Sequence, residues 1–475
     1  MVTDRYGHVL HEGTREGAAH LDRAVEALLF FSPELVPAVA DLLATDPDAP
    51  VGQALAAYLG VLGTEPADAA AARARFEEFT ARVDRTALPP RERLHTAAAG
   101  ALLSGDLHRA SRILEETSLA YPRDALALFV GHQLDFLTGD AVRLRDRVGG
   151  ALSAWDLDDP HRGAVLGMYA FGLEESGHYA EAAEAGTAAV ERNARDVWAI
   201  HAVAHAHEMR GRFADGIAWF EARTADWSAD TFLTVHNWWH YALFALEAGD
   251  TDTALRVYDT TLHHERSQGL AMELLDGAAL LWRFRLDGNG CATDLTGRWK
   301  RLADAWAARM DPPFYAFNDV HAVMAYAGAD RVAEAERLVA DRRAWLARTA
   351  PGTVTNRAMT AEIGLPVCEA LIAHARGDHA AVVDHLWPLR RRLHEFGGSH
   401  AQRDAVQKTL LDAALNSGRL DLARALLSER TALRPASTYN WLTHARLADA
   451  EGDPARAAAA RLRAHELGWS VGVPV

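Results

Sequence analysis

Lysine is almost absent from this chain of 475 residues, since Lys300 and Lys408 are the only two. Neither lies in a Gly-Lys-Ser/Thr setting, which excludes the phosphate-cradling loop of P-loop enzymes. The net charge is −16, from 65 acidic and 49 basic residues, and no dense basic stretch offsets it. Because nucleic-acid binders neutralise phosphates with a basic patch, we expect no nucleic-acid partner.

Cysteine and long apolar runs are equally scarce. Cys291 and Cys368 form no CxxC pair, which argues against a disulfide framework and against a cysteine-ligated zinc site. No window approaches roughly 18 uninterrupted apolar residues, and the first residues lack the apolar segment of a signal peptide. The sequence therefore predicts no membrane partner and a cytoplasmic location.

A recurring turn is the feature that the sequence does have. Long amphipathic stretches end at glycines that lie 34 to 49 residues apart: Gly60, Gly105, Gly139, Gly177, Gly211, Gly249, Gly288, Gly328, Gly377, Gly418 and Gly452. Glycine suits the left-handed residue through which helices commonly end. A period of about 34 residues is typical of tetratricopeptide repeats, and sustained period-two runs of strand type are lacking. We predict an all-α superhelix, a tetratricopeptide-like solenoid of about ten to eleven helical hairpins.

The length of the chain needs no division into separate cores in such a fold, because each hairpin packs only on its neighbours. We predict one solenoid domain over residues 1–475. It has a divergent helical cap over about 1–85 and a capping repeat over about 431–475. The longer glycine spacings around Asp287–Thr296 and Ala350–Arg357 predict loop insertions rather than domain boundaries.

Histidine is concentrated in one region. The chain has 23 histidines, and five of them, His201, His205, His207, His236 and His240, fall within 40 residues, where even spacing places about two. His201 and His205 are four apart, as are His236 and His240, so each pair shares one helix face. The pairs are offset by 35 residues, one repeat, which places them on the first helices of adjacent hairpins.

Those first helices line the concave groove of a tetratricopeptide stack, so both pairs are candidates for one site there. Paired imidazoles are ligands for zinc or another divalent transition metal, which makes His201, His205, His236 and His240 candidate metal ligands. The same histidines, with Asp319, His321 and Arg403, are candidate catalytic groups for acid/base chemistry at neutral pH. The alternative is that these histidines are hydrogen-bonded core residues beside tryptophans.

Other polar and aromatic residues are candidates for the wall of the same pocket. Asp276 stands in an otherwise apolar helix, and the remaining members are Asn237, Trp239, Trp282 and Asp404. Simpler roles compete, since Asn318 or Asp319 could cap a helix and Ser399 is a plausible cap as well. The zinc motif HExxH fails at His207-Glu208, because Gly211 stands where the second histidine belongs.

Several of these blocks together resemble the tetratricopeptide repeat protein 38 family. The similar segments are Met168–Glu174, His201–Met209, His236–His240, Phe317–His321, Gly364–Cys368 and Gly398–Asp404, with weaker similarity at Pro122–Leu128 and His132. They cover roughly residues 90 to 430. The resemblance implies a helical-repeat fold but supplies no established reaction, so no catalytic role is carried over.

Two hypotheses of different class remain open at this stage. In one, the chain is an enzyme or binder with a small-molecule ligand in a histidine-rich pocket of the groove, with or without a metal. In the other, it is a scaffold without catalytic activity that captures a peptide or partner protein in the groove. Convergence of the histidines in a closed pocket would favour the first hypothesis. The sequence leaves the reaction, the substrate and the oligomeric state undetermined.

Overall fold

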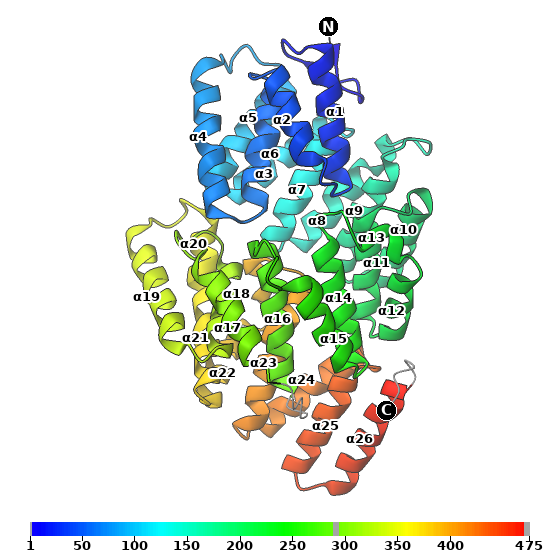
Figure 1. Cartoon of the computed structure of the whole chain (residues 1–475), viewed down its shortest axis with the longest axis vertical. Coiled ribbons are helices and arrows are strands. Elements are labelled where there is room, and N and C mark those ends of the chain that lie inside the picture. Colours follow the sequence, from blue (N-terminus) through cyan, green and yellow to red (C-terminus); the bar gives the residue numbers. More distant parts are fainter. Residues whose placement is uncertain (1, 288–293, 470–475) are drawn as a thin grey trace. The chain divides into compact units, whose positions relative to one another are not determined.

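The computed structural model describes residues 2–287 and 294–469 (Figure 1). Gly288, Cys291 and the centre of the predicted insertion at Asp287–Thr296 lie outside the described residues. Within them, the fold is all-α apart from one small hairpin, in which β1 (Val2–Thr3) pairs antiparallel with β2 (Val9–Leu10). Successive helices form hairpins, which confirms the predicted all-α class. No helix of this part combines the length and apolar character that a bilayer crossing requires.

The chain divides into two compact units. The first runs to Val203 and also includes Ala225–Thr234 and Thr349–Ala358. The second comprises Ala204–Thr224, Val235–Arg348 and the residues from Met359 onward. One continuous solenoid domain with terminal caps remains a prediction.

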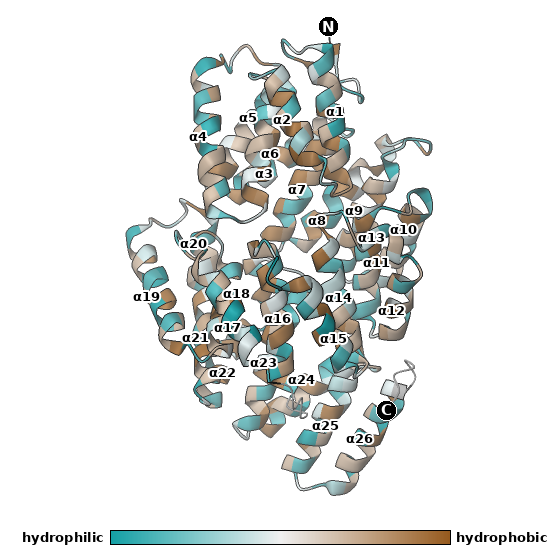
Figure 2. Cartoon of the chain, viewed as in Figure 1, coloured by the Kyte–Doolittle hydropathy of each residue, from teal (hydrophilic) through white to brown (hydrophobic). Residues whose placement is uncertain are grey.

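The first unit shows how the hairpins divide burial between their two helices. In α3 most residues are buried, whereas α4 buries only Ala69, Phe76 and Phe79. Figure 2 shows the same contrast, with α3 mainly hydrophobic and α4 carrying many hydrophilic residues. The helices are α1 (Arg15–Leu29), α2 (Leu35–Thr45), α3 (Pro50–Leu62), α4 (Pro66–Arg82), α5 (Pro90–Leu103), α6 (Leu107–Ala120), α7 (Ala125–Leu137), α8 (Ala141–Ala151), a 3-10 turn (Leu152–Ala154), α9 (Arg162–Glu175), α10 (Tyr179–Arg192), the first half of α11 (Val197–Met209), most of α13 (Thr224–Trp227) and most of α20 (Thr355–Met359).

The second unit follows the same rule. Nearly all of α18 is buried, whereas α19 buries only one stripe, which includes Leu338 and Arg342. Its helices are the second half of α11, α12 (Phe213–Glu221), α14 (Thr234–Glu247), α15 (Thr251–Val257), α16 (Ala271–Asp287), α17 (Thr296–Ala307), α18 (Ala316–Gly328), α19 (Val332–Arg348), α21 (Leu365–Ala375), α22 (His379–Leu386), α23 (His400–Asn416), α24 (Leu420–Leu433), α25 (Thr438–Ala450) and α26 (Pro454–Trp469), with π-helical turns at Tyr258–Leu262 and Thr360–Gly364 and 3-10 turns at Trp387–Leu389 and Leu393–Phe396.

Most of the repeated glycines occupy the predicted left-handed turns. Positive φ angles are found at Gly105, Gly139, Gly177, Gly211, Gly249, Gly377, Gly418 and Gly452. The prediction is wrong for two others. Gly60 lies inside α3, where an added Cβ would stand 2.3 Å from Ala72, and Gly328 ends α18 with its Cβ position 2.2 Å from the Trp299 ring. These two glycines allow close helix packing, and non-glycine residues take the left-handed conformation just after them.

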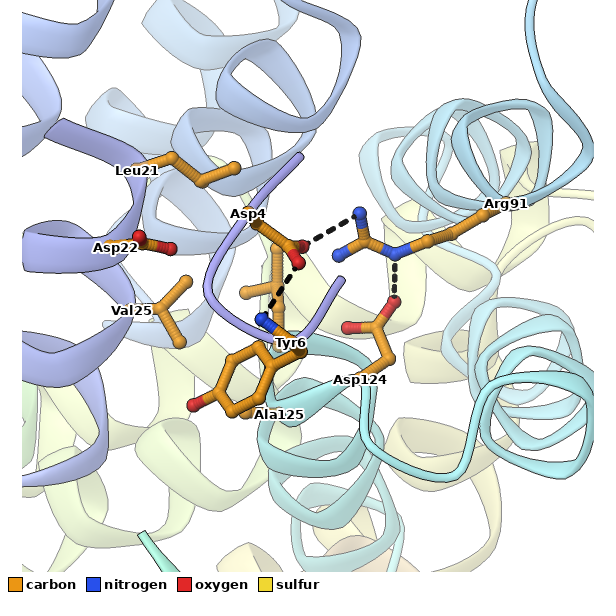
Figure 3. Close-up of a pocket in the computed structure, with 9 residues that line it drawn as sticks. Asp4, Tyr6, Leu21, Asp22, Val25, Arg91, Asp124 and Ala125 are labelled. Carbon is orange, nitrogen blue, oxygen red and sulfur yellow. Dashed lines mark hydrogen bonds and ion pairs between the residues drawn. The ribbon is translucent and has the colours of Figure 1, made fainter. Parts of the chain in front are cut away.

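Polar groups on a fully buried helix must find partners, because an unpaired buried charge is costly. In the first unit, Arg91 on α5 is such a group, and Asp4, which lies between β1 and β2, is one of its partners. Arg91 Nη1 lies 3.2 Å from Asp4, and Arg91 Nε donates to Asp124 at 2.6 Å (Figure 3). The neighbouring cavity, lined also by Tyr6 and Asp22, has a volume of about 10 Å³. That is room for about one water, so the cavity is not a ligand site.

Candidate functional site

Three histidines meet inside the second unit. His205 comes from α11, and His236 and His240 come from α14. One ligand nitrogen of each lies within 4.8 Å of the others. The ring centroids are 4.3 Å apart for His205 and His240, and 4.9 Å apart for His236 and His240. Four-residue spacing places the α14 pair on one helix face, and we call these residues the three-histidine centre.

Buried carboxylates hold two of these rings. His236 Nδ1 lies 2.8 Å from Asp276 Oδ2, and His240 Nδ1 lies 3.0 Å from Glu208 Oε2. A ring that donates its Nδ1–H to a carboxylate keeps a lone pair on Nε2, with its orientation fixed. This carboxylate–histidine pairing is the arrangement that surrounds metal ligands in proteins.

The electrostatic environment favours the neutral imidazole at His205 and His240. Burial, followed by the nearby histidines, lowers the pKa of His205 and His240 well below its ordinary value. Burial raises the pKa of Glu208 to about 7, although Arg434 and Arg283 oppose the shift. Neutral imidazole is the form that binds metals, so these two shifts favour metal binding by His205 and His240.

His201, the fourth predicted ligand, lies one turn before His205 on α11. It belongs to the part of the helix that is assigned to the first unit. Its ring centroid is 5.0 Å from that of Trp198 and 5.4 Å from that of Phe171. His201 therefore has an aromatic environment, and the centre described here consists of the second unit's three histidines.

Arg283, on α16, is a buried charge that the sequence analysis missed. Its guanidinium donates to the carbonyl oxygens of Ala279 at 2.8 Å and Ala401 at 2.5 Å, and it lies 5.5 Å from the centroid of the Trp239 ring. Its charge contributes to lowering the pKa of His240 and opposes the rise in the pKa of Glu208. The available signal was Arg283 within the otherwise apolar stretch Leu280–Phe284.

Asp319 and His321, both predicted as catalytic, lie buried on α18. Arg342 donates to both Asp319 oxygens, at 3.0 and 2.8 Å, so this carboxylate has a cationic partner. His321 Nδ1 lies 2.8 Å from the carbonyl oxygen of Phe317, and this nitrogen is the donor. The capping role considered for Asn318 or Asp319 is wrong, because α18 begins at Ala316 after Tyr315.

Arg403 and Asp404 lie on α23. Arg403 donates to the carbonyl oxygen of Gly398, and it contributes to lowering the pKa of His205 behind burial and the nearby histidines. Asp404 accepts from Arg430 at 2.6 Å and lies 3.3 Å from Arg434, and despite its burial these arginines hold its pKa far below the ordinary value. The predicted cap at Ser399 is confirmed by a complete capping box with Gln402.

The other three of the five predicted wall residues, Asn237, Trp239 and Trp282, separate into two groups. The Trp239 ring stacks on His236, with centroids 5.2 Å apart and an interplanar angle of 19°. Asn237 is fully buried, and neither polar atom of its amide has a hydrogen-bond partner in the described part of the chain. Trp282 instead donates to Thr409 Oγ1 at 2.9 Å and lies 5.4 Å from His374, ring centroid to ring centroid.

Titration of His321 provides a test of its buried environment. Burial, followed by the charge of Arg283, lowers its pKa to about 4. His321 is protonated near pH 6.5 in the unfolded chain but only near pH 4 in the folded chain. Its contribution to the free energy of unfolding is therefore complete above pH 6.5 and is lost as the pH falls. We expect this histidine to account for about 2 kcal/mol of the loss between pH 7 and pH 5.

Urea unfolding of the wild type and of His321→Gln at pH 7 and pH 5 measures this difference. The pH dependence should shrink by that amount in the variant. His385→Gln, whose side chain is 36% exposed and lies 3.7 Å from Glu369, is the control for replacing a histidine that is not buried. An equal pH dependence in wild type and His321→Gln would show that His321 is protonated normally in the folded chain.

Comparison with known proteins leaves the site unassigned. No family model matches the chain. The human IFIT1 dimer with m7Gppp-AAAA is 13% identical with a TM-score of 0.42, over 94% of this chain and 95% of that one. The APC/C hetero-tetramer Cut9-Hcn1 is 12% identical with a TM-score of 0.38, over 80% and 67%. Naa15/Naa10 bound to HypK-THB is 14% identical with a TM-score of 0.23, over 96% and 64%. These matches are tetratricopeptide-like helical-repeat proteins.

Proposed function

We propose that the second unit binds one divalent transition-metal ion, preferably zinc, at His205, His236 and His240, and that this centre hydrolyses a small molecule. The observation that carries the proposal is the convergence of three imidazoles whose ligand atoms lie within 4.8 Å of one another. Carboxylates behind His236 and His240 strengthen it, because they fix both rings without taking their Nε2 atoms.

The donor set fits the proposed ion. Three neutral nitrogen ligands with a fourth position left open are typical of catalytic zinc sites. At zinc–nitrogen distances of about 2.0–2.1 Å, the ligand atoms of a tetrahedral site lie roughly 3.4 Å apart. Because the ligand atoms lie within 4.8 Å of one another, no pair needs to approach by more than about 1.4 Å to reach that spacing.

The surrounding residues have distinct tasks in this proposal. Asp276 and Glu208 orient the rings of His236 and His240. His236, whose side chain is 18% exposed, marks the side from which an ion or ligand enters, whereas His205 and His240 are fully buried. Trp239 supplies an apolar wall, and the buried Asn237 amide supplies a donor and an acceptor for the ligand. A bound zinc ion would supply Lewis acidity, the chemistry with which zinc enzymes activate water.

A second candidate function is acid/base catalysis by His236 without a metal. The 2.8 Å contact between Asp276 and His236 favours it, because a carboxylate of this kind orients a histidine that acts as general base. Peptide capture is less favoured, since a groove that recognises a peptide needs accessible side chains and His205 and His240 are fully buried. Membership of the tetratricopeptide repeat protein 38 family and a cytoplasmic location complete the proposal.

Metal content and metal titration test the proposal. After dialysis against a chelator, Zn²⁺ or Co²⁺ should rebind to the full chain, as measured by elemental analysis and calorimetry. His236→Ala should remove the ion from this centre, and Asp276→Asn should weaken binding about 10- to 100-fold through loss of ring orientation. His207→Ala is the control, because His207 lies on α11, the helix that carries His205, with its ring 6.4 Å from that of Trp219, centroid to centroid. Unchanged binding in His236→Ala would contradict the metal centre and leave the Asp276–His236 pair as the candidate.

A further inference from the structure

A second group of metal-ligating side chains surrounds the turn between α21 and α22. His374 lies in the last turn of α21, and His379 is the first residue of α22. Gly377, with φ of 75°, makes the turn between them, and the Asp378 side chain caps α22. The turn brings the two imidazoles together, with ring centroids 5.4 Å apart and an interplanar angle of 79°.

The third member of this group comes from a different helix. Asp412 on α23 lies with Oδ2 3.1 Å from His374 Nε2, and one ligand atom from each of the three side chains lies within 4.8 Å of the others. Arg446 donates to Asp412 Oδ1 at 2.7 Å, and Asn416 donates to Oδ2 at 2.9 Å. The carboxylate is therefore held in place, with one oxygen on the side of His374.

Two nitrogen atoms in this group have no hydrogen-bond partner in the described part of the chain. They are Nδ1 of His374 and Nδ1 of His379, and both atoms are buried. The His374 residue is only 9% exposed. A buried nitrogen without a partner is unfavourable, and native structures rarely leave one unpaired. His374 turns Nε2 toward Asp412, so a shared cation would be held through that nitrogen and the carboxylate, and the unpartnered His379 nitrogen would supply a further donor.

We infer that His374, His379 and Asp412 form a divalent transition-metal site, separate in its residues from the three-histidine centre. Two imidazoles and one carboxylate suit Zn²⁺ or Co²⁺ and leave coordination positions for water. His379 is partly exposed, so the ion reaches the site from solvent. Because its ligands come from α21, α22 and α23, the bound ion would fasten the α21–α22 turn to the next helix.

The test uses the full chain carrying His236→Ala, so that the three-histidine centre does not contribute. After chelator dialysis, Co²⁺ is titrated while its visible spectrum and the heat of binding are recorded, and Zn²⁺ is then used in competition. We expect about one equivalent of Co²⁺ to bind and the thermal unfolding midpoint to rise with metal. Adding His379→Ala should weaken binding at least about tenfold and remove the rise.

The control is His385→Ala in the same background, because His385 lies on α22 with a side chain that is 36% exposed. It should bind Co²⁺ as the background does. Far-UV circular dichroism verifies that each variant is folded, and His379→Gln provides a milder variant. No Co²⁺ bound in the His236→Ala background, or binding that survives both His379 substitutions, would overturn the site. Equal stoichiometry in wild type and His236→Ala would instead count against the three-histidine centre alone.

Discussion

Replacing Arg283 with methionine is expected to lower the free energy of unfolding by about 3–5 kcal/mol, the usual cost of removing one partner from a buried charge network. The Arg283 residue is only 2% exposed and donates to the carbonyl oxygens of Ala279 and Ala401. Its charge also compensates the buried carboxylates of Glu208 and Asp404. Methionine fills similar space but supplies neither the charge nor the donors, so these acceptors lose their compensation.

Urea unfolding followed by far-UV circular dichroism measures this loss. Arg285→Met is the matched control, because Arg285 lies two residues further along α16 and is exposed. We expect it to change the free energy of unfolding by less than about 0.5 kcal/mol. Arg283→Lys should fall between the two, since it keeps the charge but loses the fork of donors. A loss below about 1 kcal/mol in Arg283→Met would show that the charge network around Arg283 is not stabilising.

The helical fold was predictable because its signal is periodic. A glycine at each hairpin turn repeats along the chain, and the structure confirms the left-handed conformation at positions such as Gly177 and Gly249. Gly60 and Gly328 look identical in sequence but serve close packing against Ala72 and Trp299. Such contacts join different helices, so the local sequence contains no sign of them.

The candidate site was predictable only where spacing governs it. Positions four apart place His236 and His240 on one face of α14, and an offset of one repeat places His205 on a neighbouring inner helix. The partners of these histidines follow from packing between helices. Glu208 was considered only as part of a failed zinc motif, yet it lies 3.0 Å from His240.

Asp319 is a second residue whose partner could not be predicted from the sequence. Its neighbour His321 made it a plausible member of a shared site, but the carboxylate accepts two hydrogen bonds from Arg342, which lies 23 residues further along on α19. An aspartate on a fully buried helix must find a cation or a donor. The sequence indicates that need, while the choice among several arginines depends on how α18 and α19 pack.

Replacing Lys408, one of the two lysines of the chain, is the second substitution for which we expect a large loss of stability. Lys408 is 1% exposed, and its ammonium lies 3.1 Å from Glu247 Oε1, 3.9 Å from Asp287 Oδ1 and 3.8 Å from the centroid of the Tyr439 ring. Although burial opposes it, Lys408 holds the pKa of Glu247 below its ordinary value. We expect Lys408→Met to destabilise the chain by about 3–5 kcal/mol, because Glu247 remains buried without its cation.

The double variant Lys408→Met/Glu247→Gln separates charge from packing. Glutamine carries no charge, so the double variant should be less destabilised than Lys408→Met alone, in a double-mutant cycle measured by urea unfolding. Lys300→Met is the control, since Lys300 is exposed and its replacement should be nearly neutral. An amine-reactive label on the native chain should modify Lys300 and spare Lys408. Equal effects of Lys408→Met and Lys300→Met would mean that the Lys408–Glu247 pair adds nothing to stability.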